Sequence, residues 1–173
     1  MVGVPGMNKK EIKKFLSLPN IAKLATVNPD GSPQISPVWF QHDRGAITFA
    51  TYKEAVKIRN IKRNPNIAVL IDSANGGLNL TGLLMQGTGI LVTGPNCKKI
   101  EKRIYDKYLP PKITGKDKVA AAFKRSVTSG SSMCIRFIPK NITAWDYTKM
   151  TMKDVMNESS QAYVRYEPEE IFT

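Results

Sequence analysis

The sequence predicts a mainly β protein whose strands form an antiparallel barrel with helices on its flanks. Short apolar runs recur along the chain, and turn-forming stretches such as Asn28–Gly31 and Asp43–Gly45 separate them at close spacing. Helical periodicity is confined to a few segments between these runs. A chain of 173 residues, 42% of them hydrophobic, suits one domain with a substantial core.

The strands are expected at residues 21–27, 34–41, 46–51, 67–71 and 83–92, with a closing pair at 133–138 and 142–145. Pro37 lacks a backbone N–H, so its strand is expected at an edge or a bulge. Pro139 separates the closing pair. Gly87 and Gly89 predict a bend or a close backbone approach in the long strand that holds them.

Four helices complete the pattern. Asn8 and Glu11 form a capping pair that opens a helix ending before Pro19. Further helices are expected at about 54–63, from Asn96 to Tyr108, and at about 118–125. We expect residues 1–147 to form the domain. Residues 148–173 form a polar tail that is partly ordered or packed on a partner subunit.

The net charge of +12 is high for a chain of this length. Residues 148–173 hold three basic and five acidic side chains, so the remaining residues carry +14. Such a charge favours anionic partners. No apolar segment has the length of a membrane span or a signal peptide, which predicts a cytoplasmic protein. Cys97 and Cys134 lie in no metal or redox motif, and whether they form a disulfide is left open.

The segment from Thr51 to Asn60 joins a strand to a basic helix. It places a hydroxyl, two lysines (Lys53 and Lys57), Arg59 and an amide around the first turns of that helix. Lysines are unfavourable near the positive end of a helix dipole unless an anion lies between them. A phosphate would use both the lysines and the free N–H groups. The alternative interpretation is a solvated basic helix face.

Several chemistries are excluded by what the sequence lacks. His42 is the only histidine, which argues against a histidine metal site or a Ser-His-Asp triad, and we expect no metal. The chain has neither a P-loop nor a G-x-G-x-x-G motif. No catalytic residue is identified. A bound cofactor that carries the reactivity itself needs few protein groups.

Four segments together resemble the pyridoxamine-phosphate-oxidase-like, FMN-binding split β-barrel superfamily. They are residues 25–40, residues 57–65 with the strand after them, residues 85–89, and residues 136–145. The resemblance covers about residues 10–147. It implies a six-stranded antiparallel split β-barrel, a homodimer, and a flavin-type cofactor in a groove between the subunits.

The resemblance also implies a set of cofactor-binding residues. Lys57 would be the main phosphate contact, and residues of the second strand would line the ring. The implied residues are Ser36, Pro37, Val38, Trp39, Thr51, Lys57, Arg59, Asn60 and Gln86. Residues 159–173 lack the basic C-terminal segment of the authentic oxidases, and the pattern is closer to the deazaflavin-dependent reductases. The cofactor is therefore expected to be FMN or, alternatively, the deazaflavin coenzyme F-420.

Three functions follow from this sequence. The first is an oxidoreductase that transfers hydride to or from a small organic substrate. The second is a flavin carrier or sensor without turnover, which would have the same fold. The third is a basic nucleic-acid-binding module, but the chain lacks a recognition-helix pattern and an RNP-like strand motif, so we do not expect nucleic acid as the partner.

Overall fold

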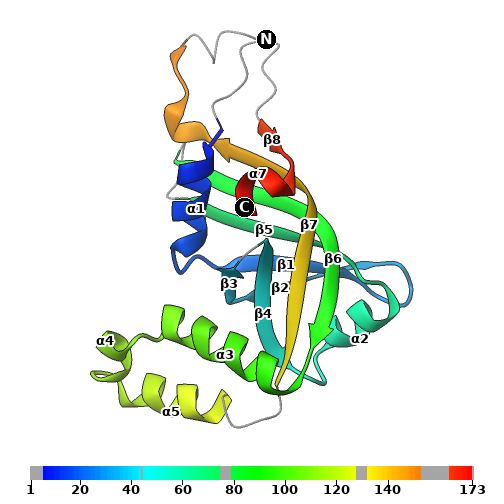
Figure 1. Ribbon diagram of the computed structural model, residues 1–173, viewed down its shortest axis with the longest axis vertical. Coiled ribbons are helices and arrows are strands. Elements are labelled where there is room, and N and C mark those ends of the chain that lie inside the picture. The colour runs from blue at the N-terminus through cyan, green and yellow to red at the C-terminus, as the bar shows by residue number, and fades with distance from the viewer. Residues whose placement is uncertain (1–5, 44, 75–78, 128–131, 153–163, 173) are drawn as a thin grey trace.

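The computed structural model describes residues 6–43, 45–74, 79–127, 132–152 and 164–172. In this part of the chain eight strands form one curled antiparallel sheet (Figure 1). They are β1 (Ala22–Val27), β2 (Pro33–Val38), β3 (Phe40–Asp43), β4 (Ala46–Tyr52), β5 (Asn66–Ala74), β6 (Leu80–Val92), β7 (Ser132–Asp146) and β8 (Val164–Tyr166). Their order is β2-β1-β5-β6-β7-β4-β3, and β8 pairs with β7. The sheet curls into a half-barrel, which confirms the predicted fold class.

The second expected strand, residues 34–41, is divided at Trp39 into β2 and β3. Val38 pairs with Ala22 of β1, whereas Phe40 pairs with Phe49 of β4. The chain therefore changes partner strands at Trp39 and turns a corner of the barrel. β2 lies at the end of the strand order, so Pro37 is on an edge, as its missing N–H predicts.

The closing pair of strands is instead one continuous strand, β7. It pairs along β6, and the register shifts between Gln86 and Gly87. Gln86 is opposite Asn141 and Gly87 is opposite Pro139, which leaves Lys140 as the extra residue of a bulge. A side chain at Gly87 would overlap the carbonyl oxygen of Ile138, so the close approach expected there is present. The apolar runs predicted seven strands, and dividing residues 34–41, joining the closing pair and adding β8 gives the eight described strands.

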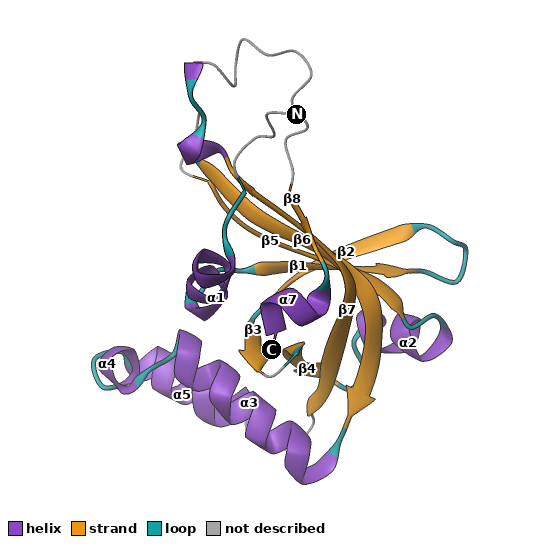
Figure 2. Ribbon diagram, turned by 45° about the horizontal axis from the view of Figure 1, so that its top comes forward, coloured by secondary structure: helices purple, strands orange, loops and turns teal. Residues whose placement is uncertain are grey.

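Helices flank the sheet at three places. They are α1 (Lys9–Ser17), α2 (Val56–Arg63), α3 (Gly94–Tyr108), α4 (Pro111–Thr114), α5 (Lys118–Val127) and α7 (Pro168–Phe172), with a 3-10 turn at Tyr147–Lys149. The predicted capping box of α1 is confirmed, because Asn8 and Glu11 each accept a hydrogen bond from the other's backbone N–H. Helices α3 to α5 form a separate layer beside the lower end of β4 and β7 (Figure 2).

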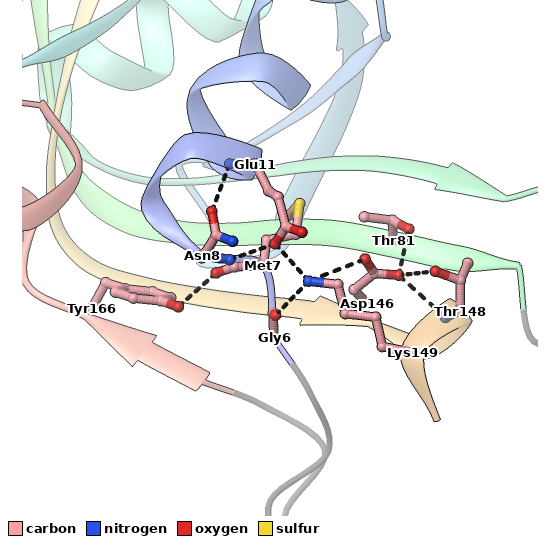
Figure 3. A network of polar contacts seen from close by, with 9 residues as sticks. All are labelled: Gly6, Met7, Asn8, Glu11, Thr81, Asp146, Thr148, Lys149 and Tyr166. Carbon is pink, nitrogen blue, oxygen red and sulfur yellow. Dashed lines mark hydrogen bonds and ion pairs between the residues drawn. The ribbon is translucent and has the colours of Figure 1, made fainter. Parts of the chain in front are cut away.

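The C-terminal residues that the structure describes pack on their own chain. β8 lengthens the sheet beside β7, and Ile171 of α7 is buried in the core. The Tyr166 hydroxyl donates to the carbonyl of Met7, and Lys149 pairs with Glu11 at 2.5 Å (Figure 3). These contacts hold the C-terminal strand and the start of α1 together. Packing of the tail on a partner subunit stays a prediction, and residues 153–163 lie outside the described residues.

Two further features bear on the sequence predictions. Cys97 of α3 and Cys134 of β7 form a disulfide, with their Cα atoms 5.3 Å apart, which answers the question that the sequence left open. Among the described residues, no helix has both the length and the apolar character needed to cross a membrane.

Candidate functional site

A pocket of about 450 Å³ lies between the corner of the sheet, the start of α2 and the helices α3 and α5. We call it the Lys57 pocket. Its lining is mainly apolar and aromatic: Ile21, Pro37, Val38, Trp39, Ala50, Thr51, Tyr52, Lys57, Ile104, Tyr105, Phe123 and Ser132. An apolar pocket of this size with a few polar groups is typical of a site for a small molecule or a cofactor.

Lys57 is the cation of this pocket. It lies in the first turn of α2, where there is neither an acidic residue nor a side-chain cap. Its side chain is half-buried, and burial lowers its pKa below the ordinary range of lysine. It forms no ion pair with any residue in the described part of the chain. A half-buried, unpaired ammonium at a helix N-terminus is suited to bind an anion.

Trp39 lies against helices α3 and α5 at the corner between β2 and β3. Its ring stacks on Tyr108 with centroids 4.8 Å apart and an interplanar angle of 4°. Tyr105 and Phe123 pack against it in T-shaped arrangements, with ring centroids 5.8 and 6.0 Å from that of Trp39. These contacts fix the indole in one orientation beside the pocket. An immobilised aromatic ring is a good surface against which a planar ligand can stack.

The helical side of the pocket was not predicted from the sequence. Tyr105 is only 8% exposed, and burial raises its pKa to about 12, so its hydroxyl stays neutral over the physiological range. Three lining residues are far in sequence from Lys57: Tyr105 on α3, Phe123 on α5 and Ser132 on β7. Ile100, Ile104 and Tyr108 are at helical spacing, which fits the helix expected from Asn96 to Tyr108, but nothing local shows which part of the sheet this helix contacts.

The predicted site residues do not all lie together. Pro37, Val38, Trp39, Thr51 and Lys57 line the Lys57 pocket. Gln86 lines a second pocket of about 380 Å³ at the bulge between β6 and β7, with Lys140 and Asn141.

The other three predicted residues make contacts within the protein. Asn60 is 1% exposed and donates to Thr26 at 3.1 Å and to Asn28 at 2.9 Å. Exposed Arg59 donates to the carbonyl of Glu54. The Ser36 hydroxyl accepts from Gln34. A direct cofactor contact by these three residues and by Gln86 stays a prediction.

Metal ligands are absent from the part of the chain that the structure places. No cluster of three or more histidine, cysteine, aspartate or glutamate side chains suited to a metal occurs there. His42 lines neither the Lys57 pocket nor the pocket at the bulge. Burial and the neighbouring Lys107 lower the pKa of His42. The Lys57 pocket therefore offers hydroxyl groups, one ammonium and aromatic rings.

A profile of the pyridoxamine 5'-phosphate oxidase family matches residues 8–146, most of the chain. The chain belongs to this family. A search of curated proteins finds no match.

Solved structures share the fold of this family member. A conserved hypothetical protein from Mycobacterium tuberculosis has a TM-score of 0.72 at 19% identity, over 92% of this chain and 98% of its own. An F420 reductase has a TM-score of 0.58 at 26% identity, over 80% of this chain and 98% of its own. A heme-binding protein from Mycobacterium smegmatis has a TM-score of 0.68 at 15% identity, over 97% of this chain and 61% of its own.

Proposed function

We propose that this protein is an oxidoreductase that binds FMN or the deazaflavin coenzyme F-420 in the Lys57 pocket and acts on a small organic substrate. The observation that carries the proposal is Lys57, a half-buried ammonium at the start of α2 that has no ion-pair partner among the described residues. It lines a pocket whose other lining residues are mainly apolar and aromatic. A cofactor with a phosphate and a planar ring system would place the phosphate at Lys57 and the ring against the apolar and aromatic lining.

The residues of the pocket fit such a cofactor. Lys57 and the first-turn N–H groups of α2 would hold its phosphate, and the Thr51 hydroxyl lies in the same lining. Trp39 would lie along the ring system. A bound flavin or deazaflavin ring supplies hydride transfer. The protein binds and orients the ring, and its apolar walls keep water away from the reacting atoms.

Relatives support the class of cofactor. The F420 reductase is 26% identical and covers most of this chain, whereas the heme-binding protein, at 15% identity, shares only the fold. Among the described residues that line the Lys57 pocket there is no histidine to ligate a heme iron. We therefore favour a flavin-type ring. A flavin carrier without turnover would use the same contacts and is separated from an enzyme only by assay.

The proposal is tested by titrating the purified protein with FMN and, separately, with the deazaflavin, followed by absorbance and fluorescence. We expect one of them to bind at one site per chain and its affinity to fall about a hundredfold in Lys57→Ala. Reduction of the bound cofactor and its reoxidation by candidate substrates then separates an enzyme from a carrier. Failure of both compounds to bind would contradict the proposal.

A further inference from the structure

Helix α5 has its polar and apolar faces the opposite way round from an ordinary surface helix. Such a helix turns its apolar face toward the protein and its charged face toward solvent. In α5, the residues Ala121, Lys124 and Arg125 line a cavity of about 510 Å³ together with residues of α3. The Nζ atom of Lys124 donates to Asp106 of α3 at 2.6 Å and to the carbonyl of Leu109 at 3.2 Å. The side of α5 that faces α3 is therefore a basic side, held by polar contacts.

The apolar side of α5 is exposed. Val119, Ala122 and Phe123 have the i, i+3 and i+4 spacing that places side chains together on one side of a helix. Val119 is 77% exposed, Phe123 is 48% exposed, and Ala122 is exposed as well. We call these three side chains the α5 apolar face. Single apolar side chains on a surface are ordinary, but a contiguous apolar face on a helix that turns its charged side inward indicates a binding surface.

This face continues the wall of the Lys57 pocket. Phe123 belongs to both, because it lines the pocket and packs against Trp39. Two other lining residues, Ile21 and Tyr52, are themselves exposed. Exposed lining residues mark where a pocket opens, so the mouth lies between Ile21, Tyr52 and Phe123. Val119 is one helical turn from Phe123, about 6 Å along the helix axis, and extends the apolar surface beyond the mouth.

The chemistry of this surface indicates what it can bind. The mouth presents an aliphatic side chain and two aromatic rings, and the α5 apolar face adds no charged group. Three side chains are far fewer than the roughly 20 to 30 residues that each partner contributes to a stable protein interface. The area instead suits the hydrocarbon group of a small molecule whose other end enters the pocket.

We propose that the substrate of this protein carries an apolar group that lies against Phe123 and Val119 of α5, while its reacting group lies in the Lys57 pocket. The inference rests on the proposed function and adds to it the chemical class of the substrate. With the cofactor phosphate at Lys57 and its ring along the apolar lining, the mouth is the part of the pocket that remains for a substrate. The hydrophobic effect is not directional, so α5 selects substrates by apolar length rather than by a particular functional group.

The proposal is tested with para-alkylphenols whose chains increase from ethyl to hexyl. These probes are neutral and combine a planar ring with an alkyl chain. Calorimetric titration measures their binding to the protein loaded with FMN, or with the deazaflavin if that is the cofactor that binds. We expect the affinity to rise about threefold with each added methylene group, because each is removed from water on α5. An affinity that stays the same from ethyl to hexyl would overturn the proposal.

Variants of α5 locate the surface that gives this increase. Val119 is mostly exposed and does not line the pocket, so Val119→Ser shortens the apolar face and leaves the cofactor site intact. It should bind the ethyl compound and FMN as the wild type does, but gain less than about twofold per methylene in the longer compounds. Val119→Leu should retain the full gain. Thermal unfolding verifies that each variant folds.

Ile90→Ser is the matched control. Ile90 of β6 is also a large exposed apolar residue, but it does not line the Lys57 pocket. Its variant should show the same dependence on chain length as the wild type. If Val119→Ser also shows that dependence unchanged, α5 is not the binding surface and the proposal is wrong.

The oligomeric state separates a substrate from a second copy of the chain as the occupant of α5. Sedimentation should give the same mass for the wild type and Val119→Ser. A wild-type dimer that becomes a monomer in Val119→Ser would mean that a second copy covers the α5 apolar face, and the inference would be wrong.

Failure of this inference is distinguishable from failure of the proposed function. If FMN or the deazaflavin binds but longer alkyl chains add no affinity, the assignment of an apolar substrate fails and the cofactor site stands. If the wild type binds neither cofactor, both proposals fail.

Discussion

The start of α2 and the end of α3 each hold a half-buried lysine, but in opposite settings. Lys107 lies in the last turn of α3, with its Nζ atom 3.6 Å from the centroid of Phe40. It donates to the carbonyl of Leu16 at 2.9 Å. Lys57 lies in the first turn of α2 and has no ion-pair partner in the described part of the chain.

This difference is the reason why we propose Lys57, and not Lys107, as a ligand-binding residue. A cation at a helix C-terminus is favoured by the helix dipole, whereas a cation at the N-terminus is opposed by it. Burial lowers the pKa of both side chains, and that of Lys107 to about 8. Burial alone therefore does not identify a site. The proposed site rests instead on the position of Lys57 at a helix N-terminus beside a pocket, where the helix dipole opposes its charge.

The largest effects are expected from removing each lysine. Lys57→Ala should lower FMN affinity about a hundredfold, because it deletes a charge-assisted contact to phosphate, and should leave the melting temperature nearly unchanged. Lys107→Ala should lower the melting temperature and leave FMN affinity nearly unchanged, since it removes packing on Phe40 and a hydrogen bond. Calorimetric titration and thermal unfolding of both variants measure this. A loss of affinity in Lys107→Ala equal to that in Lys57→Ala would break the comparison.

Asn60, one turn after Lys57 on α2, allows a structural role and a binding role to be compared within one helix. Its buried amide donates to Thr26 and Asn28 of the β1 region. Asn60→Ala should lower the free energy of unfolding by about 2 kcal/mol, because two acceptors lose their donor. Urea denaturation measures this, with exposed Arg59→Ala as the control. Weaker FMN binding at unchanged stability would instead support the direct cofactor contact that the sequence predicts.

The last expected effect is on the pH dependence of stability. The pKa of Lys107 is about 8 in the folded protein and lies in the ordinary lysine range, about 10.4, when unfolded. Between these values the unfolded chain binds a proton that the folded protein has released, so stability should rise with pH. Denaturation between pH 8 and 10 should show a smaller rise in Lys107→Met. An identical rise in that variant would contradict the assignment.

Local signals in the sequence were sufficient where neighbouring residues determine the structure. The capping box of α1, the turn at Asn28–Gly31 and the edge position of Pro37 depend on the backbone needs of a few adjacent residues. The strand-to-helix junction at Lys57 is of the same kind. It was found because a basic helix start conflicts with the helix dipole within one segment.

Two strand boundaries were missed for a reason that is not local. β2 and β3 read as one apolar run, because the change of partner at Trp39 depends on β1 and β4. β7 read as two strands around Pro139, because the bulge that accommodates the proline depends on Gly87 of the opposing strand. Both strand boundaries therefore depend on pairing between strands that are far apart in the sequence.

The sequence by itself determined the family, the split-barrel class and the strand-and-α2 side of the Lys57 pocket, since these residues lie within thirty positions of one another and their pattern is continuous. Only the tertiary structure decided the other side. Tyr105, Phe123 and Ser132 line the same cavity in the fold, and Cys97 pairs with Cys134. Gln86 lines a second pocket. Periodicity gives the buried face of a helix such as α3. What that face contacts depends on how the whole sheet curls.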